Sequence, residues 1–147
     1  EFRKPHFELK VGQKFTNFRV FRFVLREWLV REGYEVTWVK NYSKKIIAKC
    51  AKGCTWRIRA TPIQFESTFQ IKSLKGEHVC AREYKNKHAT AAYLSIKYQD
   101  KIRDNPRGGL MGLKNDIRRD LMINVSIAKV GRAMRKAKDL MLGTDME

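Results

Sequence analysis

The chain contains 147 residues, 43% of them hydrophobic, and its net charge at pH 7 is +17. This length accommodates one domain or two small ones with an apolar core. The composition excludes a transmembrane helix, because no run is long and apolar enough to cross a bilayer, and no secretory signal peptide is visible. The sequence starts and stops abruptly, so we expect it to be part of a longer protein.

The positive charge is concentrated in the first part of the chain. Residues 1–88 contain 20 lysines and arginines against 8 acidic residues, whereas residues 89–147 contain 12 against 7. A basic domain with a pI of about 10.1 has the electrostatic footprint of a nucleic-acid-binding protein. The alternatives are a basic protein with no such partner or one bound to acidic membranes. No basic amphipathic helix with a bulky apolar face dominates, so we predict nucleic acid and no membrane.

The first predicted elements are a short strand and an amphipathic helix. Residues 7–11 alternate weakly and predict a strand closed by Gly12. Asn17 is a good N-cap, and Gly33 fits the position just past the helix end. Between them, one helix face carries five apolar residues that should cover the core: Phe21, Val24, Leu25, Trp28 and Leu29. The solvated side should carry four arginines, some within reach of phosphates: Arg19, Arg22, Arg26 and Arg31.

About four strands should follow as an antiparallel sheet. Residues 34–40 alternate, which places Val36 and Trp38 on one face and Thr37 and Val39 on the other. Residues 41–44 indicate a turn, and residues 45–50 the strand that pairs back. Two further alternating runs, 56–60 and 69–71, predict a hairpin.

All three cysteines lie in one short pattern, Cys50-x3-Cys54 followed by His78-x-Cys80. Three thiolates and one imidazole form the ligand set of a tetrahedral structural zinc, whereas a disulfide scheme would leave one thiol over. Gly53 suits a tight turn with positive φ, and His78 and Cys80 would point to the same side of an extended strand. His88 is the alternative fourth ligand. The competing interpretation is three buried free cysteines and a surface histidine.

Helices are expected in the rest of the chain. Residues 81–88 are polar and basic and indicate a connector. Thr90 can cap a helix that runs to about Arg103, and a second helix spans residues 110–121. Ser126 can cap a last helix that ends at Gly143. One face of this last helix is apolar: Val130, Ala133, Met134, Ala137 and Leu140.

The last two helices are separated by a short break at residues 124–126 and therefore resemble a helix-turn-helix. In that motif the second helix lies in the major groove. Five basic residues would line that helix: Lys129, Arg132, Arg135, Lys136 and Lys138. Of these, Arg132 and Arg135 are predicted to contact DNA. The alternative is a helical bundle with solvated charges.

The cysteine–histidine spacing resembles the zinc module of the WRKY and glial-cells-missing superfamily. More closely, residues 7–80 resemble the N-terminal DNA-binding domain of plant Mutator-like transposases, with agreement in the order and spacing of a dozen positions. These positions fall within residues 11–15, Phe21, Gly33, Tyr34, Lys40, Asn41, Cys50, residues 53–60, 69–71 and 78–80. Residues beyond 80 resemble, more weakly, the helical region that precedes the catalytic domain in those transposases. They end in a sequence at 132–138 that is close to the family's Arg-Ala-Lys pattern.

The resemblance implies an α+β fold. A small, antiparallel, zinc-bound, WRKY-like sheet with an N-terminal helix would occupy residues 1–88. A helical extension of about three helices would occupy residues 89–147. Double-stranded DNA would be the partner and one structural Zn2+ the cofactor.

The resemblance also points to the strand before the first cysteine strand as the DNA reader. It names Thr37, Trp38, Val39, Lys40 and Asn41, with Lys44 and Lys45 beyond the turn. Lysine can donate to guanine, asparagine can bond adenine, and a methyl group can touch thymine. For Trp38, a position in the core is favoured over contact with DNA. Arg57 and Arg59 are expected to contact phosphates, with a solvated sheet face as an equal alternative.

Sequence-specific binding to the terminal inverted repeats of a transposable element is the function that the resemblance implies, with the nucleus as the location. The alternative is a protein-interaction or dimerisation module of a transposase-derived transcriptional regulator, in which the chain forms a homodimer or contacts other transposase domains. We expect no enzyme activity, because a zinc with four protein ligands has no open position and no nucleophile–base pair is evident. Any catalytic domain would lie beyond residue 147.

Overall fold

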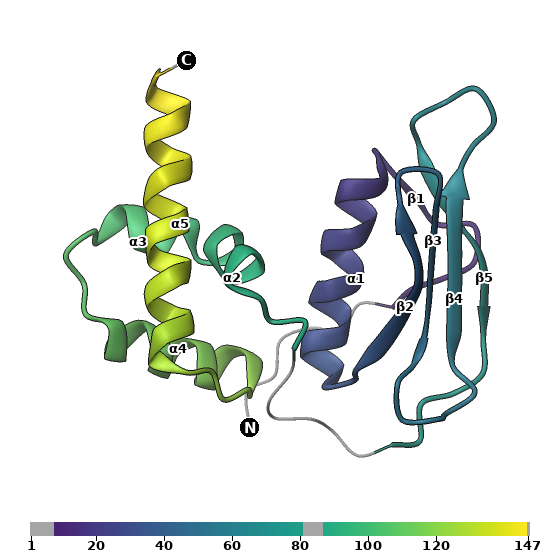
Figure 1. Ribbon diagram of the computed structural model, residues 1–147, viewed down its shortest axis with the longest axis horizontal. Coiled ribbons are helices and arrows are strands. Elements are labelled where there is room, and N and C mark those ends of the chain that lie inside the picture. The colour runs from purple at the N-terminus through teal and green to yellow at the C-terminus, as the bar shows by residue number, and fades with distance from the viewer. Residues whose placement is uncertain (1–7, 81–86, 147) are drawn as a thin grey trace. The chain divides into compact units, whose positions relative to one another are not determined.

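The computed structural model describes residues 8–80 and 87–146 (Figure 1). The chain divides into two compact units, Glu1–Arg82 and Glu83–Glu147. The sequence places the boundary after residue 88. Most of the predicted connector, residues 81–86, lies outside the described residues. The first unit contains a five-stranded antiparallel sheet and one long helix, and the second is helical, so the predicted α+β class is confirmed.

The sheet of the first unit has the strand order β1-β5-β4-β3-β2. Its strands are β1 Lys14–Phe15, β2 Val36–Tyr42, β3 Lys45–Cys50, β4 Arg57–Pro62 and β5 Phe69–Lys75. Four of these match the predicted strands, and β1 is additional. Because β2 is the last strand in this order, it pairs only with β3 in the described part of the chain.

The predicted strand at residues 7–11 is wrong for its described part. Residues 8–10 have no regular structure, and Val11 and Gly12 form a turn in which Gly12 has φ 90°. The Gly12 N–H donates to the Ile71 carbonyl at 2.8 Å, which fixes the turn to β5. The strand therefore forms only after the turn, where Lys14 and Phe15 pair with Gln70 and Phe69.

The helix α1, Phe18–Glu32, begins and ends as predicted. The Asn17 side chain accepts a hydrogen bond from the Val20 N–H at 3.0 Å, and Gly33 adopts the left-handed conformation with its N–H on the Leu29 carbonyl. Phe21, Leu25 and Leu29 are fully buried in the same cluster as sheet residues such as Ile58 and Ile71. The helix thus covers one face of the sheet, here called the inner face (Figure 1).

The opposite, outer face of the sheet is basic. Cross-strand pairing aligns two rows of side chains on it, because directly opposed residues share a face. One row is Thr37, Lys49, Arg57 and Lys75, and the other is Lys40, Ile47, Arg59 and Ser73. The alternation of Arg57 and Arg59 with buried Ile58 and Ala60 is therefore confirmed.

A β-bulge changes the predicted alternation of β2. The register shifts between Trp38 and Lys40, so that Val39 has no partner on β3. An extra residue in one strand moves every later side chain to the other face. Lys40 consequently joins Thr37 on the outer face, the place that strict alternation would have given to Val39.

The second unit contains α2 Ala91–Lys97, α3 Gln99–Asp104, α4 Leu110–Leu121 and α5 Ile127–Met146. The predicted caps are confirmed, since the Thr90 hydroxyl accepts from the Tyr93 N–H at 3.0 Å and the Ser126 hydroxyl from the Lys129 N–H at 3.1 Å. The single helix predicted from Thr90 to about Arg103 is broken at Tyr98. This residue leaves helical geometry at φ −105° and ψ 16°.

The core of this unit is formed by one face from each helix. Its largest fully buried side chains are Tyr93, Leu94, Ile117, Leu121 and Ile123. Four of the five apolar residues predicted on α5 are buried: Val130, Ala133, Met134 and Ala137. Leu140, the fifth residue of this face, is 47% exposed. The helix also continues past Gly143 to Met146.

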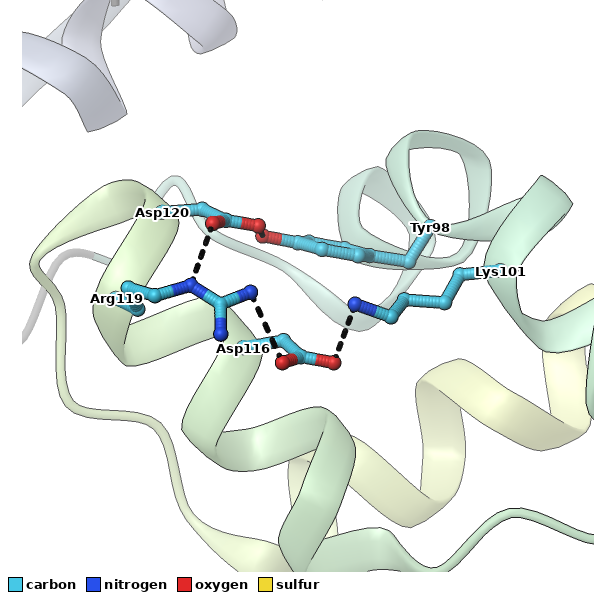
Figure 2. Close-up of polar contacts among 5 residues, drawn as sticks. All are labelled: Tyr98, Lys101, Asp116, Arg119 and Asp120. Atoms are coloured by element: carbon cyan, nitrogen blue, oxygen red, sulfur yellow. Dashed lines mark hydrogen bonds and ion pairs between the residues drawn. The ribbon is translucent and has the colours of Figure 1, made fainter. Parts of the chain in front are cut away.

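Polar contacts join α3 to α4 on the surface of the helical unit (Figure 2). Asp116 accepts from Lys101 at 2.6 Å and from Arg119 at 3.0 Å, and the hydrogen bond to Lys101 is the main reason why the pKa of Asp116 is lowered. The Tyr98 hydroxyl donates to Asp120 at 3.1 Å. At the break between α2 and α3, the Tyr98 side chain therefore contacts α4. None of the described helices is both long and apolar enough to cross a membrane.

Candidate metal centre and nucleic-acid interface

The four predicted metal ligands come together at one end of the sheet. Cys50 ends β3, Cys54 follows the turn, and His78 and Cys80 follow β5. Their ligand atoms all lie within 4.8 Å of one another. The Cys50 and Cys80 sulfurs are 3.8 Å apart, and the Cys80 sulfur is 3.8 Å from His78 Nδ1. A tetrahedral ion with metal–sulfur bonds of about 2.3 Å requires sulfur–sulfur edges of about 3.8 Å, so the residues present fit zinc.

The backbone also supports thiolates in this cluster. Gly53 has φ 90°, as predicted for the turn, and the neighbouring Lys52 N–H donates to the Cys50 sulfur at 3.4 Å. The Val79 N–H donates to the Cys54 sulfur at 3.4 Å and is the main reason why the pKa of Cys54 is lowered. Hydrogen bonds of this kind stabilise the ionised form of the ligand.

The four ligands favour a cation for an electrostatic reason. Burial, followed by the neighbouring Cys54 and Cys50 side chains, raises the pKa of Cys80 to about 12. Three thiolates so close together repel one another. A bound divalent cation reverses this effect and holds coordinating thiols deprotonated. The cluster therefore has the chemistry of a metal site rather than of three free thiols.

His78 is held between two aromatic rings. Its imidazole stacks on Tyr34 with ring centroids 4.0 Å apart and on Trp56 at 4.6 Å, and Trp56 stacks in turn on Trp28 at 5.5 Å. Burial lowers the pKa of His78 to about 4, so the ring is neutral and can donate a lone pair to a metal. Its Nε2 is buried without a hydrogen-bond partner among the described residues.

Two features of this site differ from the sequence-based prediction. His78 and Cys80 lie after the end of β5 rather than on an extended strand, and it is the turn beyond Lys75 that directs both toward Cys50. The alternative ligand His88 is not in the cluster, since the only histidine grouped with the cysteines among the described residues is His78.

Gly76 is a residue of the site that the sequence analysis missed. It has φ 78°, and a Cβ atom at this position would lie 2.3 Å from the Thr55 carbonyl oxygen. Beside it, the Glu77 N–H donates to the Thr55 hydroxyl at 3.2 Å. This close approach joins the segment after Cys54 to the segment before His78. A glycine two residues before a ligand histidine was the only indication in the sequence.

The predicted DNA-reading strand β2 lies at the open edge of the sheet. Thr37 and Lys40 are exposed on the outer face, and Asn41 and the turn residue Lys44 are exposed beyond the bulge. Lys45 is half-buried on β3, opposite Tyr42. Arg57 and Arg59 lie on the same outer face, two strands away on β4.

Trp38 and Val39 are placed differently from these polar residues. Trp38 is half-buried and packs against the core from the inner face, where the Arg26 guanidinium lies 5.6 Å from the centre of its ring. This agrees with its alternative interpretation as a core residue. Val39 is 41% exposed at the bulge, so its methyl groups are accessible at the edge.

Residues 6–71 match the family model described as MuDR family transposase, in its DNA-binding domain. This match supports an N-terminal DNA-binding domain of a Mutator-like transposase, so the resemblance read from the sequence is confirmed. No curated protein and no solved structure matches the chain.

The match to the MuDR family covers the sheet as far as Ile71, with Cys50 and Cys54 inside it and His78 and Cys80 beyond it. The helices of the second unit also lie outside the MuDR match. The predicted contacts Arg132 and Arg135 are exposed on α5, whereas Lys129 is half-buried, which lowers its pKa. Between α4 and α5, Ile123 and Val125 are buried, so the break is packed into the helical core. The helix-turn-helix interpretation stays a prediction.

Proposed function

We propose that the MuDR-type domain reads a specific double-stranded DNA sequence with the open edge of β2. Its target would be the terminal inverted repeats of a transposable element. The observation that carries this proposal is the bulge at Val39, which places Lys40 beside Thr37 on a basic face at the free edge of the sheet. Lys40 and Asn41 then lie near the end of β2, where the lysine can donate to guanine and the asparagine amide can bond adenine. The basic outer face, including Arg57 and Arg59, supplies phosphate contacts.

One structural zinc is the proposed cofactor. Three sulfurs and one imidazole nitrogen in a compact four-ligand arrangement suit zinc, which prefers tetrahedral nitrogen and sulfur ligands. Bound there, the ion would supply folding free energy to a small sheet and would leave no coordination position for water. Its ligands join the ends of β3 and β5, so it would stabilise the strands that support β2.

We further propose that this chain binds DNA without cutting it and acts in the nucleus. The absence of cutting is supported by the acidic residues of the helical unit, which are engaged in contacts between its helices. Asp116 pairs with Lys101 and Arg119, and Asp120 accepts from Tyr98 (Figure 2). These carboxylates stabilise the contact between α3 and α4, and three more aspartates lie in helices with basic neighbours: Asp100, Asp104 and Asp139.

The test begins with selection of bound sequences from a random duplex pool by the zinc-loaded chain. On the selected duplex, Lys40→Ala or Asn41→Ala should each cost roughly 1–3 kcal/mol, with little loss on random duplex. Lys14→Ala is the matched control, because Lys14 is an exposed lysine of the same sheet on β1, at the edge farthest from β2.

Equal losses on the selected and random duplexes would assign Lys40 and Asn41 to phosphate contact and reject base reading by β2. A protein-interaction module would give a different result. Its affinity for its partner would fall only slightly with salt, whereas duplex binding through phosphates falls steeply.

A further inference from the structure

The helix α1 carries a flank of three arginines, and none of them is paired with an acidic residue in the described part of the chain. At 3.6 residues per turn, Arg19, Arg22 and Arg26 fall within an arc of about 60° of the helix. No ion pair within the described residues reaches any of them, whereas Arg31 on another part of the helix pairs with Glu27 at 3.1 Å. Like charges three and four residues apart repel one another, so this flank is strained without an anion.

The sequence predicts that these arginines lie on the solvated side of the helix, but only Arg19 is exposed. Arg22 and Arg26 are half-buried, and the Nε atom of each is buried without a hydrogen-bond partner among the described residues. Burial, followed by the charge of the preceding arginine in the row, lowers the pKa of both. Guanidinium groups held close together and partly buried favour a polyanion, since each offers planar N–H donors that fit a phosphate.

Aromatic rings lie against all three arginines, and one of these rings belongs to the edge strand. The Arg19 and Arg22 guanidinium groups lie 4.8 Å and 5.1 Å from the centre of the Phe18 ring. Arg26 lies over Trp38, which belongs to β2. Because Trp38 faces inward and Lys40 faces outward, the same short strand has basic side chains on both sides: Arg26 of α1 on the inner side, and lysines and arginines of the sheet on the outer side.

We propose that Arg19, Arg22 and Arg26 form a phosphate-binding wall for duplex DNA, opposite the wall formed by the outer face of the sheet. A strand that enters the major groove edge-on has a phosphate backbone on each side. The outer face meets one backbone, and the α1 flank meets the other. The inference rests on the proposed function, to which it adds contacts with the phosphates of the second DNA strand.

The test measures binding of the zinc-loaded full chain to a random-sequence duplex between 50 and 200 mM salt. Each phosphate contact contributes about 0.9 to the slope of log affinity against log salt. The double variant Arg22→Gln/Arg26→Gln should reduce the slope by about 1.8, so that its affinity deficit shrinks roughly tenfold between the two salt concentrations. Arg31→Gln is the matched control on the same helix and should leave the slope unchanged.

A charge-preserving variant separates phosphate contact from a structural role. Arg22→Lys/Arg26→Lys keeps both charges and should retain most of the wild-type slope. If the glutamine pair does not fold, each single glutamine variant should reduce the slope by about 0.9. A folded glutamine variant with the wild-type slope would overturn this inference and leave the proposed reading by β2 standing. A wild-type chain that binds no duplex would overturn both.

Discussion

His78 shows how individual residues shape the candidate metal site. Its ring is fixed between Tyr34 and Trp56 by stacking, and its burial keeps it neutral. A histidine held in this way needs little reorganisation to bind a metal. The sequence identified the four ligands because thiols and an imidazole at these spacings have few other uses. It did not identify the rings, because their contacts join residues more than twenty positions apart.

Gly76 provides the residue-scale prediction. Gly76→Ala would put a Cβ atom against the Thr55 carbonyl in a left-handed backbone conformation. It should cost roughly 1–2 kcal/mol of backbone strain and a further 1–3 kcal/mol of overpacking. Gly53→Ala is the control, because its φ is 90° but no atom lies within 4 Å of the added Cβ, so only strain applies. Denaturant unfolding of the zinc-loaded chain measures both. Equal losses of stability would show that the approach to Thr55 does not matter.

Among the elements, those set by local interactions were predicted well and those set by distant pairing were not. Asn17, Thr90 and Ser126 each cap a helix through a hydrogen bond to a backbone N–H three residues ahead, which sequence alone can indicate. In contrast, β1 is two residues long and exists only because β5 pairs with it. The Val39 bulge is likewise a property of the pairing between β2 and β3, and the adjacent apolar residues Trp38 and Val39 are its only trace in the sequence.

The element-scale prediction concerns α5. If this helix lies against DNA, Arg132→Ala/Arg135→Ala should weaken binding to all duplex sequences and reduce the salt slope by about two. Arg103→Ala is a control for loss of a charge in the same unit, because Arg103 pairs with Asp100 on α3. Titration of labelled duplex at several salt concentrations gives the slopes. An unchanged slope, with truncation after His88 altering only the oligomeric state, would make the helices an assembly element.

At the scale of the whole molecule, the two units differ in what holds them together. The first has a thin core between one sheet and one helix, and Cys50 is part of that core. The second is closed by helix packing and by the contacts of Figure 2, with no metal-ligand cluster among its described residues. Their stabilities should therefore respond separately to metal.

Chelation tests this difference. Zinc binding to such sites contributes about 10–16 kcal/mol, more than the whole stability of a typical small domain. Removal of the metal should unfold the first unit and leave α2 to α5 folded. Metal analysis of the native chain, together with amide exchange before and after chelation, provides the measurement. Native protein without zinc, or simultaneous loss of exchange protection in both units, would contradict it.

The open edge of β2 also bears on how the protein behaves when no DNA is bound. An unpaired strand edge is a template on which a second copy can add its own strand, the usual beginning of aggregation. Lysines near the edge and a bulge within it are the features that prevent such pairing, and β2 has Lys40, Lys44 and the bulge at Val39. The charges proposed to attract the duplex thus also keep copies of the chain apart. Solubility should decrease as salt screens these charges, and a bound duplex should protect the edge.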